Sequence, residues 1–173
     1  METVDTICAI STPPGEGGIG IIRISGPKAH ELLFKIFRPA KTKENYLPRT
    51  LYLGKITNSD SNEKIDEVYG VLLKAPKTYT REDMAEIHSH GGFASQQAIL
   101  SLLIRCGARL AEPGEFTKRA FLNGRIDLLQ AEAVLDIIQS ETNEELRCAV
   151  EHLEGKLSSK INAIKNNVKG VLV

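Results

Sequence analysis

Residues 4–27, with the sequence VDTICAISTPPGEGGIGIIRISGP, decide how the chain begins to fold. Residues 4–11 and 19–25 are mainly apolar, and residues 12–18 between them have the proline and glycine content of a loop. Gly26-Pro27 then predicts the start of a helix, because a proline at an early helical position loses no hydrogen bond. The stretch predicts strand, loop, strand and helix, in that order. The expected buried face of this helix comprises Ala29, Leu32, Leu33 and Ile36.

The chain up to residue 114 continues this mixture of short strands and helices. A run of turn-forming residues at 58–62 predicts a hairpin, and Gly107 is expected to cap a helix. The further predicted elements are strands at 51–57, 65–73 and 84–90, a helix at 94–106, and a short strand at 108–111. Together they predict a sandwich of the α+β or the α/β class over residues 1–112.

The composition is that of a globular protein with balanced charge. The 173 residues include 22 basic and 22 acidic side chains, which disfavours an autonomous nucleic-acid-binding domain. No apolar run approaches the length that spans a bilayer, and the start of the chain lacks the pattern of a signal peptide. The cysteines Cys8, Cys106 and Cys148 form no CxxC pair, which predicts a cytoplasmic protein without a structural zinc site. We expect all three to be packed as small hydrophobic residues.

Residues 115–173 contain no proline and have a helical pattern. Apolar residues recur at steps of three and four from Leu128 to Val171, with Thr142 in the one long gap and Gly155 at a position for a kink. This stripe predicts a long amphipathic helix, about 65 Å if unbroken. One small domain has too little surface to cover such a stripe, so we expect a fragment of a longer protein that contains only the start of a helical domain.

Two features near the beginning of the chain invite a functional interpretation. The loop at residues 12–20 is rich in glycine, but it lacks the Lys-Ser/Thr of a phosphate-binding loop and precedes a strand. A tight connection is therefore favoured over a nucleotide site. Arg23 stands within an isoleucine-rich strand, so it either faces solvent or pairs with an anion or carbonyl group in a cleft.

The residues at 84–90 place three polar side chains at alternate positions. Glu86, His88 and His90 have the same parity, so they are expected on one face of a strand. They could bind a metal, but no further histidine or cysteine cluster supports this, and we expect no metal site. Glu86 could instead accept two parallel hydrogen bonds from the edge of a pterin or guanine. A plain surface carboxylate is the remaining alternative.

Residues 115–122 predict a short helix that ends at Asn123-Gly124, a pair prone to left-handed backbone conformation. Asp127 is expected to cap the next helix. Two breaks so close together place Arg125 at an exposed corner, which we expect to face the first domain.

Four stretches of the sequence together resemble the N-terminal part of the MnmE (TrmE) family of tRNA-modification GTPases. They are residues 5–27, 78–92 and 108–134, and the helical run that follows. The resemblance implies that residues 1–114 form a tetrahydrofolate-binding and dimerisation domain, similar to the folate-binding domain of the glycine-cleavage T-protein group. It implies the α+β class for this domain, with a mixed sheet and packed helices. It implies that residues 115–173 begin a helical domain, into which a GTPase domain is inserted.

The resemblance also implies a function. The family protein, with an FAD-dependent partner of the MnmG/GidA type, adds a carboxymethylaminomethyl-type group at C5 of the wobble uridine in tRNA. Its GTP hydrolysis depends on K⁺ and Mg²⁺, whose sites lie in the GTPase domain. No GxxxxGK[ST] motif occurs here, so this chain is expected to hydrolyse no GTP and to contain no catalytic residue. Contact of this part of the protein with tRNA is expected to be weak or indirect.

Three residues match the family's contacts to 5-formyltetrahydrofolate, namely Arg23, Glu86 and Arg125. Glu86 suits the adjacent N–H groups of a pterin, and the two arginines suit its carbonyl groups and the anionic glutamate tail. Two alternatives remain open at this point. The chain could be an oligomerisation scaffold without a ligand, as the apolar stripe suggests, or a one-carbon folate enzyme that acts alone.

Overall fold

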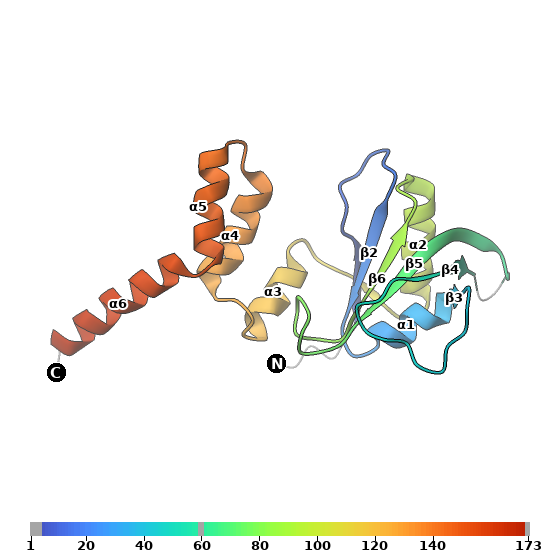
Figure 1. The fold of residues 1–173 in the computed structure, drawn as a ribbon, viewed down its shortest axis with the longest axis horizontal. Helices are drawn as coiled ribbons and strands as arrows, with labels where there is room; N and C mark the ends of the chain where they lie inside the picture. The colour runs from blue at the N-terminus through green and yellow to red at the C-terminus, as the bar shows by residue number, and fades with distance from the viewer. Residues whose placement is uncertain (1–4, 59–60, 172–173) are drawn as a thin grey trace. The chain divides into compact units, whose positions relative to one another are not determined.

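The computed structural model describes residues 5–58 and 61–171, and side chains up to residue 168. The chain divides into two compact units, residues 1–116 and 117–173. Within the described residues of the first unit, seven strands form one sheet in the order β3-β4-β5-β6-β2-β1-β7 (Figure 1). The short strand β7 runs parallel to β1, and the other neighbouring strands described are antiparallel. The strands are β1 (Ile7–Ile10), β2 (Gly20–Ser25), β3 (Phe37–Pro39), β4 (Tyr52–Thr57), β5 (Lys64–Leu73), β6 (Met84–Ser89) and β7 (Arg109–Leu110).

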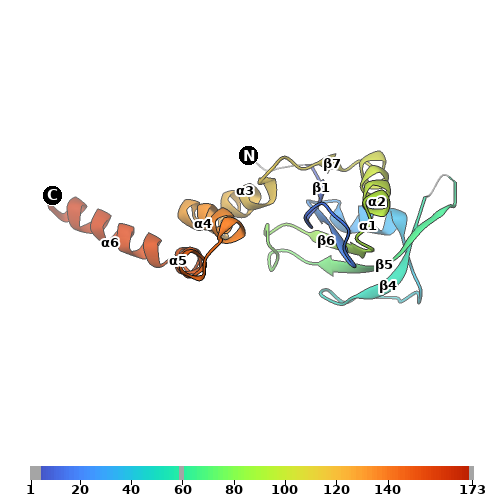
Figure 2. The same cartoon turned by 90° about the horizontal axis from the view of Figure 1, so that it is seen from above.

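Two helices, α1 (Ala29–Ile36) and α2 (Phe93–Arg105), cover one face of this sheet (Figure 2). Every second residue of the central strands points into the core beneath them, because side chains alternate between the faces of a strand. Ile22, Ile24 and Ile87 on these strands are fully buried, and so are Leu32 and Ile36 of α1. The core therefore lies between the sheet and the two helices, and the other residues of β2 and β6 face away from it.

The predicted α+β fold with a mixed sheet is confirmed. The strands expected around residues 19–25, 51–57, 65–73 and 84–90 are present with small shifts at their ends. The expected buried face of α1 is fully correct. Strand β3 was not predicted, because it follows α1 directly and no turn residue separates them. Val4 of the first expected strand lies outside the described residues.

The second unit contains the rest of α3 (Glu115–Leu122), followed by α4 (Leu128–Gln139), α5 (Asn143–Leu153) and α6 (Lys156–Val171). The end of α3 is as predicted, since Gly124 adopts φ +68° two residues after Leu122. Asp127 caps α4 as predicted, and its carboxylate accepts a hydrogen bond from the backbone N–H of Gln130 at 2.9 Å.

The prediction of one long helix after Leu128 is wrong. Ser140 leaves the helical conformation, and Thr142 then begins α5 as its N-cap. The Thr142 side chain accepts from the backbone N–H of Glu145, whose carboxylate accepts from the backbone N–H of Thr142. This capping box stabilises a new helix start in the gap of the apolar stripe. Gly155, at φ +82°, separates α5 from α6.

Helices α4 and α5 form an antiparallel pair, and the side-chain amide of Gln130 donates to the backbone carbonyl of Leu153 at 2.7 Å. Large apolar side chains nevertheless remain exposed on this unit: Phe121, Leu122, Leu128, Leu135, Ile138, Leu146, Val150, Ile161, Ile164 and Val168. Among the described residues, no helix has both the length and the apolar character that crossing a membrane demands.

Candidate ligand-binding site

The centre of the candidate site is a pair of charged residues on neighbouring strands. Arg23 of β2 and Glu86 of β6 are direct cross-strand partners, and both lie on the sheet face opposite the helices. The Arg23 guanidinium donates from Nε to Glu86 Oε1 at 3.0 Å, and its Nη2 lies 3.0 Å from the same oxygen. The Arg23 and Glu86 side chains are 29% and 17% exposed. Of the alternatives from the sequence, Arg23 thus pairs with an anion, and both side chains are only partly exposed to solvent.

His88 lies two residues further along β6 and contacts the other oxygen of the same carboxylate. Its Nε2 is 3.3 Å from Glu86 Oε2. This hydrogen bond is the main cause that lowers the pKa of Glu86, and the charge and hydrogen bond of Arg23 add to it against the opposing effect of burial. Glu86 is therefore ionised at neutral pH. A carboxylate has about four acceptor positions, so these partners leave one available on Oε2.

Two aromatic rings, which the sequence analysis did not include, lie against the guanidinium of Arg23. Its central carbon is 5.6 Å from the ring centre of Tyr79 and 5.7 Å from that of Phe116. These distances are typical of cation–π contacts. The sequence signal was the presence of aromatic residues in both motifs, Tyr79 in 78–92 and Phe116 and Phe121 in 108–134, but the meeting of Tyr79 and Phe116 at Arg23 depends on the fold.

Hydrogen bonds hold the segment that carries Tyr79 onto β2. Ser25 Oγ lies 2.6 Å from the hydroxyl of the buried Thr80 and donates to Glu82 Oε2 at 2.7 Å. The hydroxyl of Thr78 donates to the backbone carbonyl of Glu82 at 2.7 Å. These contacts restrain the backbone on both sides of Tyr79 and so help to place its ring at the site.

His90 does not belong to this group, although its parity predicted a common face with Glu86. It follows the last residue of β6, and its Nδ1 lies 2.6 Å from Asp66 Oδ1. The other Asp66 oxygen accepts from the hydroxyl of Ser95 in the first turn of α2 at 2.7 Å. Burial acts to raise the pKa of Asp66, but the hydrogen bonds from Ser95 and His90 together outweigh it and lower this pKa. The hydrogen bond with Asp66 in turn raises the pKa of His90. The described residues contain no group of three or more potential metal ligands.

Arg125 lies in the second unit, between α3 and α4, and is exposed. Its backbone N–H donates to the carbonyl of Ala120 at 2.9 Å, which closes the end of α3. The structure thus brings Arg23 and Glu86 together, while the approach of Arg125 to them stays a prediction.

The glycine-rich loop is packed through contacts of its own. The backbone N–H of Ile21 donates to the Thr12 hydroxyl at 3.3 Å, and that hydroxyl lies 3.4 Å from Oε1 of the buried Gln96 in α2. A side chain at Gly91 would overlap the backbone carbonyl of Gly17, so glycine at 91 allows the loop to approach the end of β6.

The cysteines differ from one another in burial. Cys8 is fully buried, and burial raises the pKa of its thiol to about 11. Cys106 is half-buried, but Cys148 is exposed on α5, so the prediction that all three are packed residues is wrong for Cys148.

Comparison with known proteins agrees with the motifs. Residues 6–125 match the family model described as "GTP-binding protein TrmE N-terminus". The chain is 56% identical over 168 residues to the tRNA modification GTPase MnmE of Acetivibrio thermocellus, which covers 97% of this chain and 37% of the relative. It is 53% identical over 171 residues to the protein of the same name from Thermoanaerobacter pseudethanolicus, covering 98% and 37%. The chain thus spans little more than a third of the length of these relatives, and it belongs to the TrmE N-terminal family.

Proposed function

We propose that this chain is the folate-binding and dimerisation region of a tRNA-modifying GTPase. In this proposal residues 1–114 bind 5-formyltetrahydrofolate or another one-carbon tetrahydrofolate and form a homodimer. Residues 115–173 begin the helical domain. The observation that carries the proposal is the ionised Glu86, paired with Arg23 on the face of the sheet that the helices leave uncovered.

The chemistry of the site fits a pterin. The pterin edge presents adjacent N–H groups, and an ionised carboxylate accepts such a pair well. Glu86 keeps one acceptor position on Oε2, and the contact of this oxygen with His88, at 3.3 Å, is longer than the two contacts of Arg23 with Oε1 at 3.0 Å. Arg23 offers a cation beside it, and the rings of Tyr79 and Phe116 border the guanidinium. Arg125 is proposed as a further cation for the glutamate tail.

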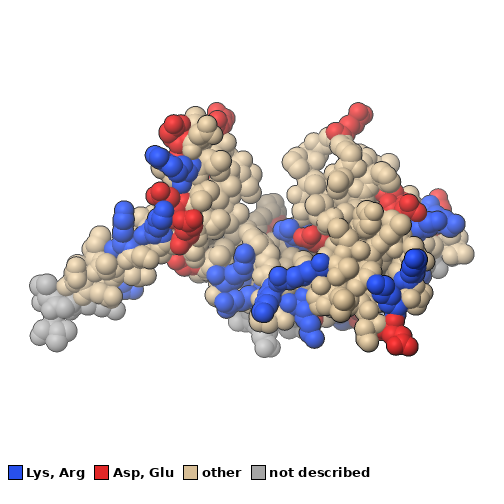
Figure 3. All heavy atoms as spheres, viewed as in Figure 1, with Lys and Arg blue, Asp and Glu red and all other residues tan. Residues whose placement is uncertain are grey.

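The remaining functions belong to the proposal for the whole protein. GTP hydrolysis with K⁺ and Mg²⁺ would reside in a domain outside this sequence, and modification of the wobble uridine at C5 would require the FAD-dependent MnmG/GidA-type partner. Acidic and basic side chains are both present on each unit in the face shown in Figure 3, in line with the 22 basic and 22 acidic residues. Contact of this region with tRNA is therefore proposed to be weak or indirect. Separately, we propose that the protein is cytoplasmic.

A second candidate is an oligomerisation scaffold without a ligand. The exposed apolar side chains of the helical unit favour it, since surfaces of this kind mark interfaces. This candidate predicts self-association of the chain but no folate binding.

Calorimetric titration with 5-formyltetrahydrofolate tests the proposal and separates the two candidates. Glu86→Gln removes the charge and places an amide donor against the pterin N–H groups, so we expect affinity to fall by a factor of about 10 to 100. Glu67→Gln is the matched control, because Glu67 is an exposed residue of β5 whose backbone pairs with Lys55 rather than with a residue of the site. Binding by the wild-type chain that only Glu86→Gln weakens supports the folate site. A folded chain that self-associates in light scattering but releases no heat with folate supports the scaffold.

A further inference from the structure

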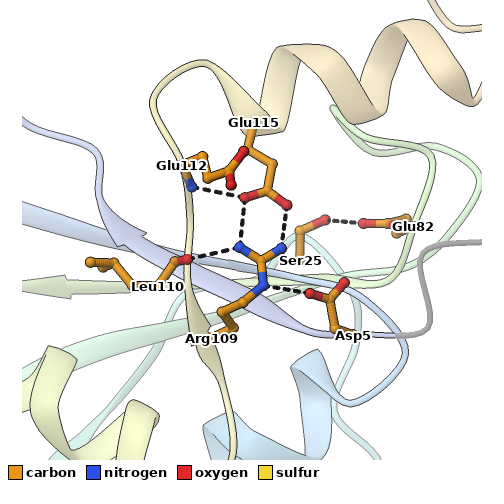
Figure 4. Close-up of polar contacts among 7 residues, drawn as sticks. All are labelled: Asp5, Ser25, Glu82, Arg109, Leu110, Glu112 and Glu115. Atoms are coloured by element: carbon orange, nitrogen blue, oxygen red, sulfur yellow. Dashed lines mark hydrogen bonds and ion pairs between the residues drawn. The ribbon is translucent and has the colours of Figure 1, made fainter.

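A second cluster of ion pairs in the first unit lies at the edge strand β7, outside the candidate site. The guanidinium of Arg109 donates to both oxygens of Glu115, from Nη2 to Oε1 at 2.5 Å and from Nη1 to Oε2 at 3.0 Å (Figure 4). Its Nε donates to Asp5 Oδ2 at 2.6 Å, and Nη1 also donates to the carbonyl of Leu110 at 3.0 Å. The two carboxylates raise the pKa of Arg109, which stays charged. The planar fork of an arginine thus has all its edges engaged.

The Glu115 side of this cluster is nearly sealed from solvent. Its side chain is 8% exposed, and Oε2 accepts a second hydrogen bond, from the backbone N–H of Glu112 at 2.8 Å. The backbone N–H of Glu115 in turn donates to the carbonyl of Glu112 at 3.0 Å. Glu115 is the first residue of α3, so the bidentate pair fixes the position and rotation of the first turn of this helix.

Phe116 is the next residue, and its ring is one of the two that lie against Arg23. A continuous path of contacts therefore runs from Arg109 through Glu115 and Phe116 to the guanidinium of Arg23. The Asp5 contact of Arg109 is not on this path, because it joins β7 to the segment before β1.

We propose that Arg109 is a positioning residue for the Arg23–Glu86 site, which acts by holding Phe116 against Arg23 through its bidentate pair with Glu115. As far as ligand affinity is concerned, this inference rests on the proposed function. The orientation of Arg23 can be measured without any ligand. A lysine at position 109 keeps the charge but loses the fork, so it does not replace Arg109 in this role.

The first test observes Arg23 directly in the ligand-free 173-residue chain. Nitrogen-15 NMR of arginine side chains detects the Nε–H of Arg23, whose resonance is shifted by the ring current of Phe116. Phe116→Leu identifies that shift. Arg109→Lys and Glu115→Gln are expected to move the resonance in the same direction as Phe116→Leu. Asp5→Asn, the matched control, removes the other ionic contact of Arg109 and is expected to leave the resonance in place. If Arg109→Lys and Glu115→Gln both leave it in place while Phe116→Leu moves it, the inference is overturned.

The second test is titration of the same variants with 5-formyltetrahydrofolate. We expect Arg109→Lys, Glu115→Gln and Phe116→Leu each to weaken binding about fivefold, the size of one lost cation–π contact, and Asp5→Asn to leave it unchanged. Wild-type binding with equal affinity in Arg109→Lys contradicts the positioning role. If the wild-type chain itself does not bind 5-formyltetrahydrofolate, the proposed function fails. The NMR result alone then decides whether Arg109 positions Phe116 against Arg23. Circular dichroism checks that each variant is folded. If Arg109→Lys does not fold, the result for Glu115→Gln is used in its place.

Discussion

Replacement of His88 by alanine should make the candidate site bind folate more tightly. In the free protein, the His88 ring occupies one position on Glu86 Oε2, at 3.3 Å, while Arg23 makes both of its contacts to Oε1. A pterin that presents two adjacent N–H groups to the carboxylate has to use Oε2. His88 therefore competes with the ligand for this oxygen.

The size of the effect follows from the geometry. Hydrogen bonds to charged groups contribute about 1.5–3 kcal/mol, and the length of this one places it below that range, at about 1 kcal/mol. Loss of the competing contact should then lower the Kd about fivefold. The same substitution should destabilise the free protein by about 1 kcal/mol, because Glu86 loses a partner that water replaces only in part.

Calorimetry for affinity and urea unfolding for stability measure the two effects. His90→Ala is the matched control, because His90 bonds to Asp66 and not to Glu86. It should reduce stability without a change in Kd. Carbon-13 NMR of the Glu86 carboxyl adds a readout that needs no ligand. The pKa of Glu86 should rise in His88→Ala, because the hydrogen bond from His88 is the main interaction that lowers it. Weaker folate binding in His88→Ala would refute the reasoning and would make His88 a direct contact of the ligand.

Three further predictions concern stability. Thr142→Ala should lower the free energy of unfolding of the helical unit by about 1 kcal/mol through loss of the N-cap of α5, measured by thermal circular dichroism. Ile22→Ala should cost about 2–5 kcal/mol because Ile22 is fully buried, whereas Ile19→Ala, at a 67% exposed position, should change the urea midpoint little. The raised pKa of His90 means that its stabilising contribution is complete below pH 6.5 and is lost as pH rises through the folded-state pKa. The urea midpoint should thus fall on going to alkaline pH in the wild type, and this fall should be smaller in Asp66→Asn.

The parts of the fold that could be predicted are those set by local patterns. The alternation around Ile22 and Ile24 marks a strand with one buried face, and the spacing of Leu32 and Ile36 marks the buried face of α1. The break at Gly124 was equally clear, because few residues other than glycine adopt its φ of +68°.

The parts that could not be predicted depend on partners far away in the sequence, or on one local signal that outweighs another. The apolar stripe through Thr142 suggested a continuous helix, but the Thr-x-x-Glu capping box begins a new one there. The alternation of side chains along a strand predicted that His90 lies on the same face as Glu86. However, β6 ends at Ser89, one residue before His90, and His90 pairs with Asp66.

At the candidate site, the sequence identified Arg23 and Glu86 as residues of interest through the family resemblance. Their contact depends on the pairing of β2 with β6, across 63 residues of chain. The sequence could not predict the contacts that join Arg23 to Tyr79 and Phe116, or the link from Phe116 to Arg109, because no local pattern associates these residues. These contacts are seen only in the three-dimensional structure.

The location of the Arg23–Glu86 pair on two interior strands of the sheet has a dynamic consequence. Each strand has a hydrogen-bonded neighbour on both sides, β6 and β1 for β2, and β5 and β2 for β6. Backbone amides in such positions exchange with solvent only when a large part of the domain opens. The backbone segments that carry Arg23 and Glu86 therefore keep their register on the timescale of ligand exchange. Entry and release of a ligand should be governed by rotation of the surrounding side chains, on the nanosecond scale, rather than by opening of the backbone.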